Sequence, residues 1–206
     1  KKMTKKNVLL IKSSINGDFS KSNQLSNAIV EKIKNTYQEC LIETIDLSEN
    51  PLPFLTAEMY RAFSTPKSER SPAQSAVILP SENAIQQIKK ADILVLAVPL
   101  YNFGIPASLK AWLDQIARAN ETFSYATGAP QGLLTNKKVY LAISSGGVYS
   151  EGMMKAYDFT ENYLRIILGF MGMTDVETFR LEGIFVPNMG EHAVNKALEA
   201  VETFSF

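Results

Sequence analysis

Short apolar runs alternate with amphipathic helical segments along the whole 206-residue chain. Runs with the length of buried strands cover residues 8–11, 41–47, 93–98, 138–143 and 176–181. Apolar side chains recur on one helical face in residues 22–37, 85–90, 107–119, 157–170 and 189–204. Strands separated by helices form a parallel sheet with right-handed crossovers and helices on both faces. The pattern therefore predicts a single α/β domain over residues 1–206, with a five-stranded sheet in the common order 2-1-3-4-5.

Two segments depart from this alternation. Residues 50–80 carry five prolines and four serines, and within them only residues 56–63 have the pattern of a short helix. A connection of this length is a functional lid or a mobile loop, and the sequence leaves both interpretations open. Residues 1–6 lack the apolar core of a signal peptide. We expect them to form a flexible, solvated tail.

The charge balance and the cysteine content argue against several classes of protein. Lys plus Arg and Asp plus Glu both number 21, and this zero net charge disfavours general nucleic-acid binding. Cys40 and His192 are the only residues of their types, too few for a structural zinc site within one chain, so no metal is expected. No apolar stretch is long enough to cross a membrane. We therefore expect a cytoplasmic protein with neither a membrane nor a nucleic-acid partner.

The most informative segment is PLYNFGIPASLKAWLD, which begins at Pro99. It follows a predicted buried strand and opens a predicted helix, with Tyr101, Asn102, Phe103 and Gly104 between them. Ligands of open α/β sheets bind beyond the carboxyl ends of the strands. Two aromatic rings, an amide and a glycine at that end suit a flat aromatic ligand. The alternative is an ordinary turn whose rings pack on neighbouring side chains.

Two further loops are expected at the same end of the sheet. Residues 12–22 are rich in hydroxyl groups, and the helix that follows them presents unpaired N–H groups, which together favour an anion. Neither GxGxxG nor GxxxxGK[ST] is present, which favours a single terminal phosphate. The alternative is that Ser20 or Ser22 only caps the helix.

The loop after the fourth predicted strand is Ser144, Ser145, Gly146 and Gly147. Paired glycines allow the backbone to approach a ligand closely, or they form a plain turn. The three loops together would supply phosphate donors, stacking rings and a backbone edge. These are the parts needed to hold a flavin mononucleotide (FMN).

Four blocks of the chain resemble, in order and spacing, the FMN-dependent NADH:quinone and azo-compound oxidoreductases, or azoreductases. The blocks are KSSINGDFSKSNQLS, PLYNFGIPASLKAWLDQIARANETFSY, GLLTNKKVYLAISSGG and LGFMGMTDV. The resemblance spans about residues 7–200, and the part PLYNFGIPASLK is shared with the wider NAD(P)H:quinone reductases. It implies a flavodoxin-like three-layer sandwich with tightly but non-covalently bound FMN, and ping-pong, two-electron reduction of quinones and azo bonds by NADH or NADPH. It also implies a homodimer whose substrate pocket lies at the subunit interface.

By position, the resemblance implies roles for individual residues. The FMN phosphate and ribityl chain would be held by Ser14, Ser20, Lys21 and Ser22. The isoalloxazine ring would be lined by Leu100, Tyr101, Asn102 and Phe103, and its pyrimidine edge by Ser144, Ser145, Gly146 and Gly147. The aromatic wall of the substrate pocket would contain Tyr125 and Phe170. No catalytic side chain is expected, because the cofactor carries the chemistry.

The chain departs from the family pattern at two of these positions. Lys21 stands where glutamine is frequent, and Ser145 where arginine is frequent, so the redox potential and the nucleotide preference do not follow from the resemblance. Basic residues of the insert, Arg61, Lys67 and Arg70, are candidates for contact with the 2′-phosphate of NADPH. Two other classes remain open: a flavodoxin-type electron carrier without small-molecule turnover, and a flavin-free α/β interaction domain.

Overall fold

The computed structural model describes residues 2–206, with side chains from residue 5 onward, and its centre is a parallel sheet. The sheet consists of β1 (Lys2–Lys12), β2 (Tyr37–Asp46), β3 (Ile93–Pro99), β6 (Lys138–Ser144) and β7 (Asp175–Leu181). Their order is β2-β1-β3-β6-β7 and every pairing is parallel. This is the predicted order 2-1-3-4-5. The intervening β4 (Phe123–Ser124) and β5 (Gln131–Gly132) form a separate antiparallel hairpin.

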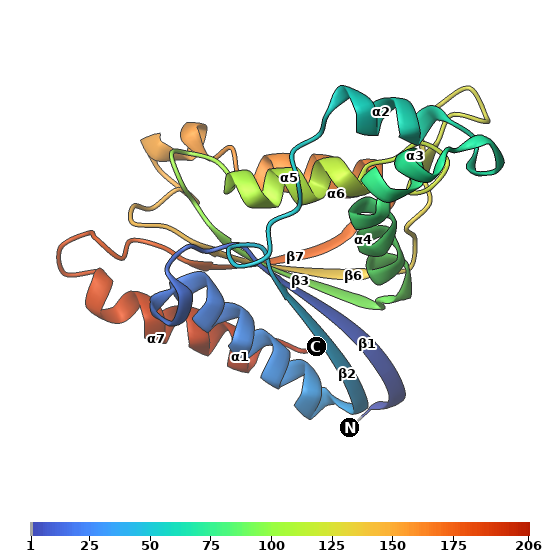
Figure 1. Cartoon of the computed structure of the whole chain (residues 1–206). Coiled ribbons are helices and arrows are strands. Elements are labelled where there is room, and N and C mark those ends of the chain that lie inside the picture. Colours follow the sequence, from blue (N-terminus) through green and yellow to red (C-terminus); the bar gives the residue numbers. More distant parts are fainter. Residues whose placement is uncertain (1) are drawn as a thin grey trace.

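Helices cover both faces of the sheet, as predicted (Figure 1). One face carries α1 (Lys21–Thr36) and α7 (Gly190–Thr203), and the other carries α4 (Leu79–Lys90), α5 (Ala107–Ile116) and α6 (Glu161–Phe170). All seven positions of β3 are buried, so its side chains supply both cores in alternation. Those of Leu94, Leu96 and Val98 pack with α4, α5 and α6. Those of Ile93 and Val95 pack with α1 and α7.

The amino-terminal strand is longer than its apolar run. β1 begins at Lys2, and Lys5 and Lys6 pair with Glu39 and Cys40 of β2. The prediction of a flexible tail is therefore wrong for residues 2–6, and Lys1 lies outside the described residues. Apolar periodicity missed this part of β1 because the sequence there is mostly charged or polar, whereas backbone pairing with β2 makes it a strand.

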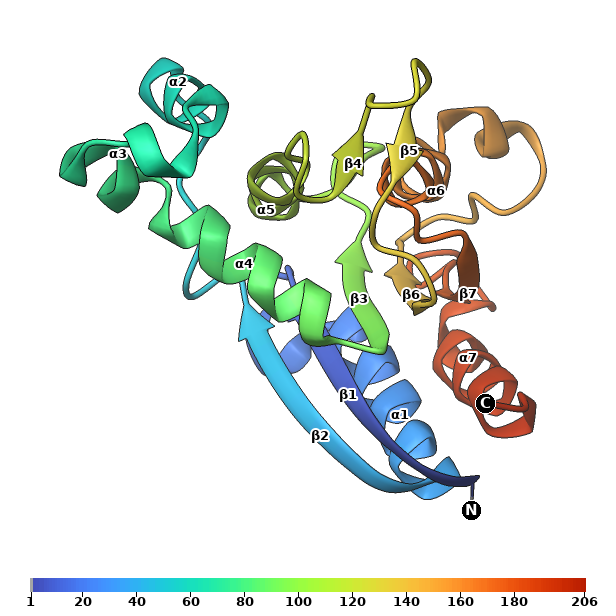
Figure 2. The same ribbon diagram turned by 90° about the vertical axis from the view of Figure 1, so that its right-hand side faces the viewer.

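The segment of residues 50–80 is more helical than expected. It contains α2 (Ala57–Ser64), a 3₁₀ turn at Lys67–Glu69 and α3 (Pro72–Val77). α3 begins with a capping box at Ser71 and a proline at its first position, a start signal within the region predicted as loop. Both views place α2 and α3 beyond α4, at the side of α5 (Figures 1 and 2).

A buried charge cluster fastens this segment to the domain. Arg118, only 4 % exposed, and Arg70 both lie 3.2 Å from Oε1 of Glu82 on α4. Gln115 of α5 also donates to the carbonyl oxygen of Pro53 at 2.8 Å. These contacts favour a packed helical unit over an open mobile loop. In the part of the chain that the structure describes, no helix is long and apolar enough to cross a membrane.

Candidate functional site

The loops that follow β1, β3, β6 and β7 gather at one end of the sheet, at the left of Figure 1. A hollow of about 480 Å³ lies there, a size typical of small-molecule sites. It is lined by Leu100, Asn102, Phe103, Gly146, Gly147, Tyr149, Phe185 and Val186. Five of these eight residues were predicted to contact the flavin ring, so the structure brings the loops after β3 and β6 together as expected.

A strained turn forms one wall of the hollow. Tyr101 and Gly104 exchange both backbone hydrogen bonds, at 3.0 and 3.1 Å. Between them, Asn102 and Phe103 have positive φ angles of 50° and 71°, the pattern of a type I′ turn. Asparagine tolerates this conformation, but a phenylalanine there costs on the order of 1–3 kcal/mol, and such strain clusters at functional sites. The turn thus holds an amide and an aromatic ring at the hollow.

The glycine pair forms the opposite wall. Ser144 and Ser145 are buried, and the carbonyl groups of Gly146 and Gly147 accept hydrogen bonds from the backbone of residues 183–185. An added Cβ at Gly146 would lie 2.4 Å from the ring of Phe185. The absence of a side chain here therefore allows the β7–α7 loop to approach closely, and this packing role does not depend on a ligand.

Phe185 was not predicted as a site residue, although its ring is 87 % exposed beside the hollow. Val186 and Tyr149 were also missed. All three residues come from loops without a recognisable motif. The rule that ligands bind at carboxyl ends, applied to the last strand as well, would have indicated Phe185 and Val186.

The loop after β1 carries the predicted phosphate donors. Ser20 caps α1 by accepting a hydrogen bond from the N–H of Asn23 at 3.2 Å, and its hydroxyl lies 3.0 Å from that of Ser22. The capping role is thus present. The N–H of Asn23 is used by the cap and that of Gln24 by the carbonyl group of Ser20, which leaves the N–H groups of Lys21 and Ser22 available. The hydroxyl of Ser14 lies 3.2 Å from that of Tyr101, which joins this loop to the turn at the hollow. Lys21 contacts Gln24 at 3.5 Å, at the edge of the same loop.

The donor set fits FMN. The Ser20–Ser22 contact uses one of the two hydroxyl hydrogens, so the other can reach a phosphate oxygen together with the N–H groups of α1. Oδ1 of Asn23, on the first turn of α1, is buried without a hydrogen-bond partner among the described residues. A ribityl hydroxyl is a donor of the kind this atom lacks. Phosphate donors, a sugar-hydroxyl acceptor and aromatic walls therefore occur side by side.

Tyr125 and Phe170 lie elsewhere. Their rings meet through Phe123 of the β4–β5 hairpin, at centroid distances of 5.7 and 4.5 Å. Figure 2 shows this hairpin between α5 and α6. Neither residue lines the hollow of its own chain, so their predicted contact with substrate stays a prediction that depends on a second subunit.

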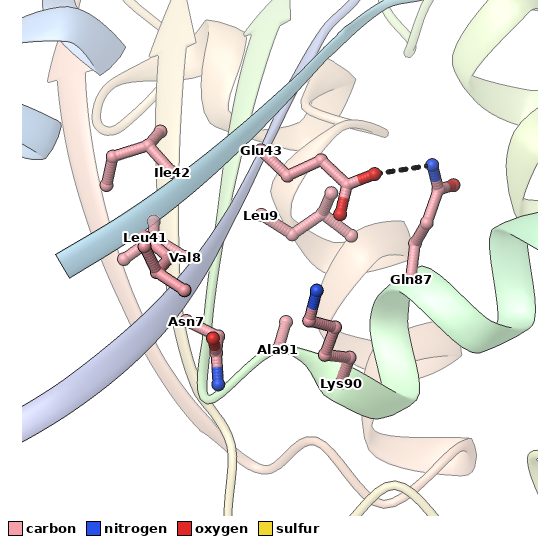
Figure 3. Close-up of a pocket in the computed structure, with 9 residues that line it drawn as sticks. All are labelled: Asn7, Val8, Leu9, Leu41, Ile42, Glu43, Gln87, Lys90 and Ala91. Carbon is pink, nitrogen blue, oxygen red and sulfur yellow. Dashed lines mark hydrogen bonds between the residues drawn. The ribbon is translucent and has the colours of Figure 1, made fainter.

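Two other hollows are distinct from this one. The first, of about 600 Å³, lies on the far side of the strained turn and is bounded by Tyr101, Ile105, Lys110, Phe159 and Tyr163 among others. The second, of about 140 Å³, lies between β1, β2 and α4, where Gln87 donates to Glu43 at 2.8 Å (Figure 3). This smaller hollow contains none of the predicted site residues.

The insert offers less to a nucleotide than its basic residues suggested. Nε of Arg70 donates to the carbonyl groups of Ala62 and Thr65, and NH1 donates to Glu82. Nε and NH1 of Arg70 are thus engaged within the fold. No residue of 50–80 lines the hollow at the carboxyl edge, so a role of this segment as lid or in substrate choice stays a prediction.

The sheet order and the hollow at its carboxyl edge define a protein of the flavodoxin-like class, and a family model described as "Flavodoxin-like fold" matches residues 6–204. Over 196 residues the chain is 42 % identical to a protein of Herminiimonas arsenicoxydans named FMN-dependent NADH:quinone oxidoreductase, covering 95 % of this chain and 94 % of that protein. A protein of the same name from Alteromonas mediterranea is 43 % identical over 192 residues, 93 % of this chain and 92 % of the relative. The chain belongs to the family of FMN-dependent NADH:quinone oxidoreductases.

Solved structures agree with this assignment. The crystal structure of an azoreductase from Bacillus anthracis strain Sterne matches with a TM-score of 0.87 and 28 % identity, covering 95 % of this chain and 96 % of that one. An FMN-dependent NADH-azoreductase from Bacillus anthracis strain Ames Ancestor, solved in complex with FMN, matches with a TM-score of 0.81 and 25 % identity, covering 97 % and 98 %. The family resemblance and the fold class predicted from the sequence are confirmed.

Proposed function

We propose that this chain is an enzyme that uses bound FMN to transfer two electrons from NADH to quinones and to the azo bonds of aromatic compounds. One observation carries the proposal: a strained aromatic turn and a hydroxyl-capped helix start meet at the carboxyl edge of the sheet, joined by the Ser14–Tyr101 contact. This arrangement occurs in a chain that shares 42 % identity with a named FMN-dependent NADH:quinone oxidoreductase over 95 % of its length.

Each loop has a binding role in this proposal. When bound, FMN supplies the redox chemistry, accepting a hydride and donating electrons to the second substrate. The start of α1, with the hydroxyls of Ser20 and Ser22, holds the phosphate through N–H groups and the positive end of the helix dipole. Asn102 and Phe103 fix the plane of the ring, and Gly146 presents backbone at its edge.

The fixed backbone of these loops also contributes electrostatically. N–H groups of the strained turn are held in position before the reaction, so they can stabilise negative charge on a bound ring without reorganising. The turn is rigid because both of its backbone hydrogen bonds are formed. Because orientation and electrostatics suffice, no acid–base pair of side chains is required.

We also propose a homodimer. Phe103, Tyr157 and Phe159 expose aromatic surface beside the hollow, and exposed apolar patches of this kind mark interaction sites. The Tyr125–Phe123–Phe170 cluster, which its own hollow does not use, becomes a wall of the substrate pocket if it serves the partner. We further propose a cytoplasmic location, where NADH is available as the reductant.

Mixed dimers test the shared pocket. One subunit carries Ser20→Asp, which removes FMN binding but keeps Tyr125; the other carries Tyr125→Ala and binds FMN. If Tyr125 serves the partner's flavin, the mixed dimer regains one complete site and is more active than either variant dimer. If Tyr125 serves its own chain, the mixed dimer has no complete site. A wild-type protein that is a monomer by light scattering and is fully active would also contradict the proposal.

The activity itself is tested with purified protein. Bound FMN is measured by absorbance and phosphate content, and NADH and NADPH oxidation is followed with benzoquinone, a quinone panel and an azo dye. We expect one FMN per chain and quinone-dependent oxidation of NADH. FMN binding without quinone-dependent turnover would indicate an electron carrier, and no FMN uptake would indicate a flavin-free domain.

A further inference from the structure

Arg180 of β7 is enclosed by carboxylates, and its side chain is only 14 % exposed. Its NH2 group bonds to Asp158 and to Glu161, the latter at 2.5 Å, and its Nε donates to Glu161 at 3.1 Å. NH1 is buried, makes no hydrogen bond among the described residues, and lies 3.7 Å from Glu182. Burial lowers the pKa of this guanidinium, but the hydrogen bonds that it donates to Glu161 and Asp158 outweigh burial and raise it, so Arg180 stays charged.

Glu182 connects this cation to one wall of the hollow. Its Oε2 accepts hydrogen bonds from the N–H groups of Tyr149 at 2.9 Å and Ser150 at 3.2 Å, and its Oε1 bonds to the Ser150 hydroxyl. Only Val148 separates these residues from Gly147, and Tyr149 lines the hollow. The position of this wall therefore depends on where Glu182 is held.

Asp158 connects the same cation to the opposite wall. Its carboxylate accepts from the N–H groups of Thr160 and Glu161 at the start of α6. Phe159 lies between Asp158 and Thr160 in the chain, and its N–H donates to the carbonyl group of Phe103 at 3.1 Å. The ring of Phe103 also lies 6.3 Å from that of Tyr149, so the two walls meet at this aromatic residue.

We propose that Arg180 is a positioning residue that sets the spacing between the two walls of the ring site, acting through Glu182 on one side and Asp158 on the other. The inference rests on the proposed function, since the hollow must hold a flavin ring. Three carboxylates surround Arg180, and Arg165 offsets only one of them, at 2.8 Å from Glu161. Without Arg180 the like charges of Asp158 and Glu182 repel, and the walls separate. A planar guanidinium presents nitrogens toward both carboxylates at once, whereas a lysine ammonium is a single point charge.

Binding of flavin to apoprotein measures the spacing without relying on activity. Dissociation constants for FMN and for riboflavin, which lacks the phosphate, are measured by fluorescence quenching, together with the visible circular dichroism of the bound ring. We expect Arg180→Met to raise both constants by the same factor, about tenfold or more, because supporting contacts fix the geometry of a site. Arg180→Lys keeps the charge but reaches only one wall, so the circular dichroism of its bound ring is still expected to differ from that of the wild type.

Arg165→Met is the matched control. It removes an arginine from the same carboxylate, Glu161, but from a position that does not reach Glu182, so both constants and the ring dichroism should stay as in the wild type. If Arg180→Met does not fold, Arg180→Lys and Glu182→Gln carry the test, with the same expectation of altered dichroism. Unchanged riboflavin binding and dichroism in the Arg180 variants would overturn the inference. Failure of the wild type to bind FMN would instead overturn the proposed function.

Discussion

Ser20 has two roles that a pair of substitutions separates. It caps α1 through the N–H of Asn23, and we propose that it faces the FMN phosphate. Ser20→Ala removes the cap and is expected to lower the free energy of unfolding by about 1 kcal/mol. Ser20→Asp keeps the cap, because aspartate is among the best N-cap residues, and is expected to leave stability nearly unchanged.

The effects on FMN affinity should follow the opposite order. Loss of one hydrogen bond to a charged phosphate costs about 1.5 kcal/mol, roughly tenfold in the dissociation constant. An aspartate at residue 20 places a carboxylate against the phosphate in a position only 3 % exposed. At about 4 Å and an effective dielectric constant of about 20, each pair of unit charges repels by about 4 kcal/mol, so affinity falls by up to about a thousandfold.

Urea unfolding of the apoproteins and fluorescence titration with FMN and riboflavin measure these effects. Riboflavin is the control: both variants should bind it as the wild type does, because it has no phosphate. Wild-type affinity of Ser20→Asp for FMN would refute the reasoning and place the phosphate elsewhere. Equal losses for FMN and riboflavin would show that the substitution disturbs the loop rather than the phosphate.

Four further substitutions test the packing and the electrostatics of the fold. An added Cβ at Gly132 would lie 2.1 Å from backbone, whereas at Gly146 it would meet the movable ring of Phe185. In urea unfolding, Gly132→Ala should therefore lower the free energy of unfolding by about 1–3 kcal/mol, and Gly146→Ala clearly less. Equal losses of stability would contradict this. Arg118→Met removes a buried cation that donates to Ser81 and Glu82, and leaves Arg70 as the remaining ion-pair partner of Glu82. It should lower stability by about 1–3 kcal/mol, with faster tryptic cleavage within residues 64–72; unchanged cleavage would count against the anchoring role. Burial raises the pKa of Glu161, but hydrogen bonds from a threonine and two arginines outweigh it and hold the pKa below its usual value. Glu161 therefore stabilises the fold above its unfolded pKa, and this contribution is lost as the pH falls through the lower folded pKa, so Glu161→Gln should flatten the acid decline in stability below about pH 4.5; an equally steep decline in the variant would contradict it.

The sequence placed the loops after β3 and β6 at the edge where the hollow lies, while their contact with a flavin stays a prediction. Tyr101, Asn102 and Phe103 follow the most apolar strand directly, and parallel strands must end at one edge, so their position needed no knowledge of side-chain packing. Phe185 and Tyr149 were missed because nothing in their local sequence distinguishes them from other loop residues. Their place at the hollow depends on long-range contacts, such as the carbonyl group of Gly146 accepting from residue 185.

The insert shows a second limit of local patterns. Arg70 looked available to a nucleotide because the sequence shows a basic residue in a polar, proline-bearing segment. In the structure its Nε and NH1 groups donate to Ala62, Thr65 and Glu82, partners that a charge count does not reveal. Similarly, residues 2–6 looked like a tail because all of them except Met3 are polar, although backbone pairing with β2 makes them part of the sheet.

The sequence by itself determined the α/β class and the loops expected at the carboxyl edge of the sheet, and it limited the cap of α1 to Ser20 or Ser22. These features depend on periodicity and on short-range chemistry, which neighbouring residues encode. Only the tertiary structure decided that Phe103 occupies a strained turn, that Tyr125 and Phe170 lie outside their own hollow, and that Arg180 connects both walls of the ring site. Those features depend on distances between residues far apart in the chain, and packing sets such distances after the elements have formed.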